Sequence, residues 1–353
     1  MVVIDEIHFH GGRVLRDVPG GSGFYSTLGA RLAVPQSESK TICCLIPAGD
    51  DFPSSAISQI QDWGVEVKLQ KIAGSPSTRG LLCYKDDVFG DKTFRYTSPP
   101  LRPDLSKLPE ALLRSSAIHT LASPEDLASQ TDTLKTLRGM STTTQPLIAW
   151  EPSPLHCKGA WKDHLDVAGR VGVVSPNDNE VTAMQGTGLG TPYSRSRVEA
   201  AASMISGDWD TDEMLERRWV TVVRCGEHGC LVIPRCADPL WLPPYHDIGS
   251  EKVVDATGAG NAFLGAFAVA FEKMGDEVLA SAYGAVAASF VIEQVGPPGR
   301  EVVDGREVWN GEEFEARLSG YKDKLASWDT RVESRDLFKR NPEWRGRWGV
   351  LFG

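Results

Sequence analysis

The chain has 353 residues, of which 41% are hydrophobic and 24% are charged, and its formal net charge is −10. This composition is typical of a soluble globular protein, and the negative charge argues against nucleic acid or an anionic membrane as the main partner. No apolar run approaches the ~18 residues of a membrane span, and the N-terminus lacks the features of a signal peptide. We therefore expect a cytoplasmic protein that needs no membrane partner.

Strand-like and helix-like segments alternate along the chain. Strands are expected at 1–9, 41–47, 65–72, 117–121, 146–150, 171–174, 219–224 and 230–233, with a hairpin at 79–97. Helices are expected after the glycines at 20–23, between the later strands, and at 262–271, 276–294 and 312–325. The alternation predicts an α/β fold, in which helices cover both faces of a mostly parallel sheet. The tail, 331–353, is interpreted as an extension packed on the body, with a partner or dimer contact as the alternative.

The seven cysteines are scattered and odd in number, which favours a reducing compartment. Cys225, His228, Cys230 and Cys236 lie close in sequence, but their spacing matches no common zinc pattern. We therefore expect buried structural cysteines there and no metal site.

The stretch from Val253 to Phe271 carries the strongest functional pattern. A β-branched run predicts a short strand ending in Asp255, Gly258-Ala259-Gly260 predicts a tight turn, and the apolar residues after it predict a buried helix. Free N–H groups and the helix dipole at such a helix start bind anions, and small residues let a phosphate approach the backbone. The stretch therefore predicts a phosphate site, and a turn that needs glycine only for its geometry is the alternative.

The same stretch resembles the C-terminal signature of the PfkB (ribokinase-like) kinase family, Asp-Thr-x-Gly-Ala-Gly-Asp followed by Phe. The matching residues are Asp255, Thr257, Gly258, Ala259, Gly260 and Phe263. Ala256 replaces the usual Thr, and Asn261 stands where the family has its catalytic Asp. The resemblance covers roughly 4–293 and implies a ribokinase-like three-layer fold in a domain of residues 1–330. It also implies a small β lid formed by strands near 8–19 and 78–98.

Weaker motifs near the N-terminus follow the family's order. The resemblance implies that Asp5 binds substrate hydroxyls and that the backbone at Gly20 and Gly21 lies against the substrate. Tyr25 occupies a position where the family often has Asn, so the usual ribose-binding mode is not expected, and simple core packing of Tyr25 is the alternative.

Further motifs concern the nucleotide. Asn177 and Glu180 match the family's Asn-x-x-Glu, which implies that Glu180 holds Mg²⁺ through water, and a helix cap is the alternative. Gly226 and Gly229 match a turn that lies against the nucleotide, and a plain hairpin turn is the alternative. ATP and Mg²⁺ are thus the implied cofactors, and K⁺ near Asp255 and Thr257 is a candidate third.

A PfkB-type kinase transfers the γ-phosphoryl group of ATP to an alcohol group of a small molecule such as a sugar or nucleoside. The amides of Gly258, Ala259 and Gly260 would bind the moving phosphoryl oxygens, and residue 261 would take the hydroxyl proton. An Asn has no useful basicity, so three functions stay open. The first is a kinase with a weakened base, in which Asp5 is a substitute base. The second is a pseudokinase that binds nucleotide or ligand without phosphoryl transfer. The third is an enzyme repurposed for another reaction. If only the base is missing, Asn261→Asp is expected to increase transfer. The acceptor stays undefined, and a homodimer is a candidate assembly.

Overall fold

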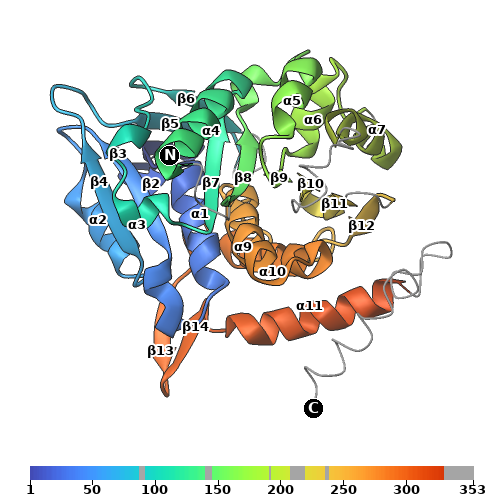
Figure 1. Cartoon of the computed structure of the whole chain (residues 1–353). Coiled ribbons are helices and arrows are strands. Elements are labelled where there is room, and N and C mark those ends of the chain that lie inside the picture. Colours follow the sequence, from blue (N-terminus) through green and yellow to red (C-terminus); the bar gives the residue numbers. More distant parts are fainter. Residues whose placement is uncertain (87–91, 140–144, 191, 207–218, 235–237, 330–353) are drawn as a thin grey trace.

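The computed structural model describes residues 1–86, 92–139, 145–190, 192–206, 219–234 and 238–329 (Figure 1). Its strands are β1 (Val3–His8), β2 (Val14–Gly20), β3 (Cys43–Ala48), β4 (Glu66–Lys71), β5 (Arg79–Tyr84), β6 (Lys92–Tyr96), β7 (Ala117–Ala122), β8 (Leu147–Pro152), β9 (Val173–Val174), β10 (Val220–Arg224), β11 (Cys230–Pro234), β12 (Leu240–Leu242), β13 (Arg300–Val303) and β14 (Arg306–Trp309). Its α-helices are α1 (Gly21–Leu32), α2 (Ser54–Gln61), α3 (Glu110–Leu113), α4 (Pro124–Arg138), α5 (Trp161–Ala168), α6 (Asp178–Met184), α7 (Arg195–Ser206), α9 (Ala259–Met274), α10 (Glu277–Val291) and α11 (Phe314–Asp329).

A six-stranded sheet in the order β12-β11-β10-β9-β8-β7 lies at the centre. Strands β7 to β10 run parallel, while β11 and β12 are antiparallel to their neighbours. Successive strand residues enter different cores, because side chains alternate between the two faces of a sheet. Ala149 and Val173 pack with α1, α9 and α10, whereas Trp150 and Val174 pack with α4, α5 and α7. The prediction of an α/β sheet covered on both faces is confirmed.

A second, four-stranded sheet has the order β2-β1-β5-β6. Strand β1 pairs antiparallel with β2 and parallel with β5, and β5 and β6 form the hairpin expected from the sequence. This small sheet contains the segments for which the sequence predicted a lid. The chain passes from β2 directly into α1 at Gly20 and Gly21, so the small sheet and the helical layer are joined there.

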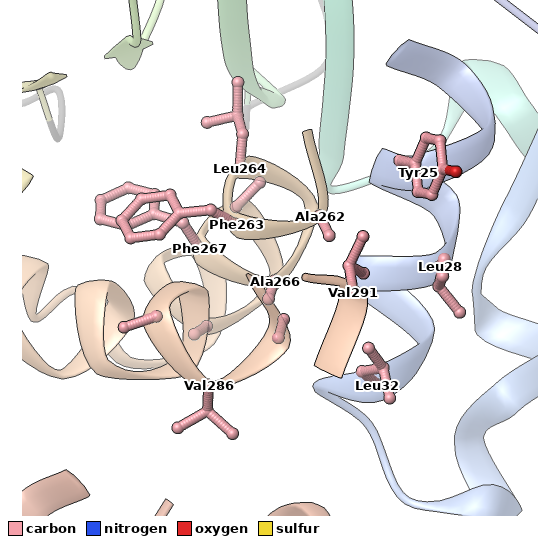
Figure 2. Packing of buried hydrophobic residues seen from close by; sticks show 14 of the residues in the cluster. Tyr25, Leu28, Leu32, Ala262, Phe263, Leu264, Ala266, Phe267, Val286 and Val291 are labelled. Carbon is pink, nitrogen blue, oxygen red and sulfur yellow. The ribbon is translucent and has the colours of Figure 1, made fainter. Parts of the chain in front are cut away.

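Helices α1 and α9 cross with their backbones in direct contact. A Cβ atom added to Gly29 would lie 1.9 Å from the carbonyl oxygen of Ala262, and one added to Gly265 would lie 1.9 Å from the carbonyl oxygen of Ser26. Figure 2 shows the apolar side chains of both helices around this crossing, together with residues of α10. The two glycines therefore determine how closely the two helices approach each other.

The predicted strand at Val253 and Val254 is wrong. These residues form an extended connection, and the N–H groups of Val254 and Asp255 both donate to the carbonyl oxygen of Ile292, at 2.8 and 3.1 Å. A strand needs a neighbouring strand to accept its amides, and here one carbonyl at the end of α10 accepts both. The β-branched residues correctly predicted an extended backbone, but among the described residues no strand pairs with this segment.

Among the described strands, β3 and β4 pair only with each other, so the parallel layer is interrupted between β3 and β7. A cavity of about 590 Å³ lies at this interruption. It is lined by Cys43, Leu45 and Pro47 from β3, by every residue of β7, and by Met1. None of the residues from Asp255 to Asn261 lines it, so this cavity is separate from the predicted phosphate site.

Three further expectations from the sequence concern membrane helices, a metal site at the cysteines and the C-terminal tail. Within the described part of the chain, no helix is long and apolar enough to cross a membrane. Cys225 and Cys230 are free, buried cysteines, and no three His, Cys, Asp or Glu side chains of the described residues are placed to hold a metal. Cys236 and the tail, 331–353, lie outside the described residues.

Candidate functional site

The predicted anion turn joins the extended connection to α9. Gly258 has φ +82°, a left-handed conformation that glycine adopts without strain, and it precedes the first residue of α9. The amide of Ala259 donates to the carbonyl oxygen of Ala256 at 3.3 Å. The amides of Gly260 and Asn261 have no acceptor among the described residues. Two of the amides at this helix start are therefore available to an anion, and the amide of Ala259 is already paired.

Tyr25, on α1, covers one side of this turn. Its side chain is 6% exposed, and a Cβ atom added to Gly258 would lie 2.3 Å from its ring. Burial raises the pKa of the phenol above its ordinary value, so the hydroxyl stays protonated. The structure thus places Tyr25 in the core beside the turn, as the packing alternative expected, and substrate contact by Tyr25 stays a prediction.

The side chain of Asn261 is held by a buried glutamate. Its Nδ2 atom donates to both carboxylate oxygens of Glu151, at 2.7 and 2.8 Å. Arg224 Nη1 donates to Glu151 Oε1 at 2.9 Å, and His119 Nε2 lies 3.4 Å from Glu151 Oε2. Burial alone would raise the pKa of Glu151, but the neighbouring guanidinium group of Arg224 and imidazole of His119 lower it to about 2. Glu151 is therefore ionised at neutral pH, and it orients the amide of Asn261.

Arg224 extends this network toward the helix start. A Cβ atom added to Gly260 would lie 2.7 Å from Arg224 Nη1, so the guanidinium group lies beside the anion turn. Its Nη2 donates to the carbonyl oxygen of Ser175 at 3.0 Å and lies 3.5 Å from Glu180 Oε2. Its Nε is buried and has no acceptor among the described residues. The carboxylate of Glu151 already pairs with this guanidinium, so an anion at the two available amides would meet a partly compensated positive charge.

Asn177 and Glu180 form a capping box at the start of α6. Glu180 N donates to Asn177 Oδ1 at 2.8 Å, and Asn177 N donates to Glu180 Oε2 at 2.7 Å. The helix-cap interpretation is thus correct, and it leaves Glu180 Oε1 without a partner among the described residues. Burial raises the pKa of Glu180 to about 7. One carboxylate oxygen fits a single water-mediated contact to Mg²⁺, so that role stays a prediction.

Asp5 lies in the middle of the small sheet with a buried, unpartnered oxygen. Cβ atoms added to Gly20 and Gly80 would lie 2.4 and 2.3 Å from its two carboxylate oxygens, so only glycines leave room for it. Its Oδ1 atom has no hydrogen-bond partner among the described residues, and burial raises its pKa to about 7. A hydroxyl group is the kind of donor that would satisfy this oxygen.

The raised pKa of Asp5 predicts a pH-dependent stability. The folded chain binds this proton more tightly than the unfolded chain, so stability is lost as the pH rises from about 4 to about 7. Three pH units at about 1.4 kcal/mol each give up to about 4 kcal/mol. Asp5→Asn is therefore expected to raise the free energy of unfolding above pH 7 and to change it little at pH 4. Urea titrations across this range test it, with Glu110→Gln at an exposed site as control. An equal effect at both pH values would contradict the prediction.

Two residues of the small sheet contact the anion turn. Lys92 Nζ lies 3.0 Å from Asp255 Oδ1 and 2.6 Å from Thr257 Oγ1, and Tyr84 OH donates to Asp255 Oδ2 at 2.6 Å. Asp255 Oδ1 also accepts from the N–H and hydroxyl groups of Thr257, at 3.0 and 2.7 Å. Strands β5 and β6 are thus tied directly to the turn that precedes α9.

The Gly226 and Gly229 turn is not brought against the anion turn by any described contact. Gly229 has φ +88°, and a Cβ atom there would lie 1.9 Å from the carbonyl oxygen of Leu242. The close backbone approach at Gly229 is therefore to the end of β12, which fits the hairpin-turn alternative. A nucleotide contact at Gly226 stays a prediction.

Sequence reasoning missed Glu151, Arg224, His119, Tyr84 and Lys92. Glu151 and Arg224 carried a usable signal, because each is a charged residue in or at the end of an otherwise buried strand. Charges in such positions of neighbouring parallel strands converge at one edge of the sheet. Lys92 and Tyr84 carried no signal, since lysine and tyrosine in a hairpin are common.

Comparisons with known proteins show the family of the chain. The model of the family described as "pfkB family carbohydrate kinase" matches residues 18–299. An uncharacterized protein of Schizosaccharomyces pombe is 30% identical, with 96% of each chain covered. Protein MAK32 of Saccharomyces cerevisiae is 28% identical, over 96% of this chain and 94% of the relative.

Solved structures show the same fold at lower identity. Ribokinase from Giardia lamblia has a TM-score of 0.68 and 14% identity, covering 93% of this chain and 97% of its own. Ribokinase from Cryptococcus neoformans in complex with ADP has a TM-score of 0.62 and 18% identity, covering 92% and 97%. The chain thus has the ribokinase-like α/β fold that its sequence implied.

Proposed function

Because the chain belongs to the pfkB carbohydrate kinase family, we propose that it binds ATP and transfers the terminal phosphoryl group to an alcohol group of a small molecule. The observation that carries the proposal is the pair of unpaired amides of Gly260 and Asn261 beside the guanidinium group of Arg224. These groups would bind phosphate oxygens, and Asp5 would accept a hydrogen bond from the acceptor's hydroxyl group. Glu180 would hold Mg²⁺ through water, and the ion would neutralise charge on the phosphates.

A second candidate function is binding without transfer. It is favoured by the side chain of Asn261, whose Nδ2 atom donates to Glu151 and leaves no base at this position. General-base help is typically worth about 10²- to 10⁴-fold in rate, so its loss permits slow transfer or none. In the kinase proposal Asp5 is the substitute base, whereas binding without transfer needs no base.

Nucleotide binding is tested first, by thermal melting with ATP and Mg²⁺. At about 100 times the Kd, a ligand adds about 2.7 kcal/mol of stability, which raises the Tm of a domain of this size by several degrees. Gly260→Asp is expected to remove this shift, because its Cβ atom would displace the guanidinium group of Arg224, 2.7 Å away, and its carboxylate would repel phosphate. Gly188→Asp adds the same charge at an exposed site and is the control. If the wild-type Tm does not respond to ATP, the proposal fails.

Transfer is tested next, by ATP consumption in the presence of sugars, nucleosides and other small alcohols. Turnover with any acceptor supports the kinase, and ATP binding with no turnover on the whole set supports the second candidate. The acceptor's identity would follow from the first compound that both shifts the Tm and is consumed.

A further inference from the structure

The carboxylate of Asp255 is where the resemblance implied a potassium ion. It is 2% exposed, and its two oxygens already receive four contacts from Lys92, Tyr84 and Thr257. Oδ1 accepts from Lys92 Nζ, Thr257 N and Thr257 Oγ1, so its lone pairs are used, while Oδ2 accepts from Tyr84 OH. The ammonium group at Oδ1 would also repel a second cation placed at this carboxylate. The residues present therefore do not fit a potassium ion at this carboxylate.

Lys92 supplies the charge that such an ion would bring. A buried carboxylate needs a compensating positive charge, and the ammonium group of Lys92 forms the ion pair with Asp255 at 3.0 Å. The same group donates to the hydroxyl group of Thr257 at 2.6 Å. The lysine comes from β6, far away in the sequence, and it reaches the turn from the side of the small sheet.

We propose that the ammonium group of Lys92 is a built-in substitute for a monovalent cation at the anion turn, so that this chain binds its nucleotide without K⁺. The inference rests on the proposed function for its nucleotide part. The ammonium group holds the Asp255 carboxylate and the Thr257 hydroxyl in place, and these two groups shape the backbone that leads to Gly258. Lys92 is thus a positioning residue for the amides of Gly260 and Asn261.

The experiment compares wild type, Lys92→Ala and Lys92→Met in chloride salts of potassium, ammonium and tetramethylammonium at equal ionic strength. The readouts are the Tm without nucleotide and the Kd for ATP with Mg²⁺. Wild type is expected to give the same values in all three salts. Lys92→Ala is expected to have a lower Tm and an ATP Kd weakened about tenfold or more. Potassium and ammonium should restore both values in part, because each is small enough to enter the space left by the side chain.

Lys92→Met is the matched control, because its side chain fills the space without a charge. It is expected to show the same loss as Lys92→Ala and no restoration by either ion. Lys68→Ala, which removes a half-exposed lysine of β4, is expected to show neither effect. Restoration of Lys92→Met by potassium as strongly as Lys92→Ala would overturn the inference, since the ion would then act elsewhere.

The two proposals fail in different ways. If wild type has a higher Tm or a lower ATP Kd in potassium than in tetramethylammonium, the proposal that Lys92 replaces a cation is overturned. The kinase proposal would still stand. A wild type that binds no ATP in any salt, with a Lys92→Ala Tm that still recovers in potassium, overturns the kinase proposal and supports the built-in cation.

Discussion

Exchanging the acid and the amide between positions 151 and 261 is expected to raise phosphoryl transfer by about 10²- to 10⁴-fold. In the double variant Glu151→Gln/Asn261→Asp, the amide at 151 would donate to a carboxylate at 261, reversing the present pair of Asn261 Nδ2 and Glu151. The net charge of the pair is unchanged, so Arg224 keeps an anionic partner nearby. Position 261 gains a group that can accept the proton of an alcohol. The rate of ATP consumption with saturating acceptor measures the effect.

The two single variants distinguish the effect of a base at position 261 from the effect of its hydrogen bond to residue 151. Asn261→Asp alone brings a second carboxylate to hydrogen-bond distance of the buried Glu151, so a loss of about 3 kcal/mol in stability is expected. The sequence alone suggested that this single change would raise transfer, and the contact with Glu151 is the reason we now expect a smaller gain. Glu151→Gln alone should add no activity. A double variant that folds and binds ATP but transfers no faster than wild type would exclude the missing base as the limiting factor.

Replacing Gly265 by Ala is expected to destabilise the fold by at least about 3 kcal/mol and to abolish ligand binding. The added Cβ atom would lie 1.9 Å from the backbone oxygen of Ser26, and backbone cannot rotate away as a side chain can. Helix α1 would have to move from α9, and Tyr25 would then leave Gly258. Urea denaturation measures the first effect and ATP-induced melting shifts measure the second.

A glycine at a comparable helical position gives the control. Gly320 lies on the exposed side of α11, and a Cβ atom there would have no neighbour within 4 Å. Gly320→Ala is therefore expected to be neutral or stabilising by up to about 1 kcal/mol, from helix propensity alone. Equal effects of the two substitutions would show that the close helix crossing does not limit stability.

The sequence predicted the layered fold well because local patterns carry it. Alternating strands and helices, and the small-residue turn before α9, follow from rules that act over a few residues. The strand expected at Val253 and Val254 failed because strand formation depends on a partner, which a single segment does not reveal. The cap formed by Asn177 and Glu180 was among the stated alternatives, since that pattern is local as well.

The candidate site could be predicted from the sequence only where a single segment of the chain contains the binding groups. The turn at Gly258 to Asn261 is such a segment. Glu151 is 110 residues from Asn261 along the chain, and its hydrogen bonds depend on how β8 and α9 pack. Lys92 reaches Asp255 across 163 residues. Contacts of this kind come from the tertiary fold, so a list of matching motif positions could not contain them.

The interruption between β3 and β7 should be visible in amide hydrogen exchange. Leu147 N donates to Ser116 O and Ser153 N to Ala122 O, so the even-numbered residues of β7 direct their peptide groups to β8. The peptide groups of neighbouring residues in a strand point toward opposite edges of the sheet. The amides of Ala117, His119 and Leu121 therefore point away from β8 and toward the cavity. None of these three amides has an acceptor among the described residues. Along this one short strand, slowly and rapidly exchanging amide protons should therefore alternate, residue by residue.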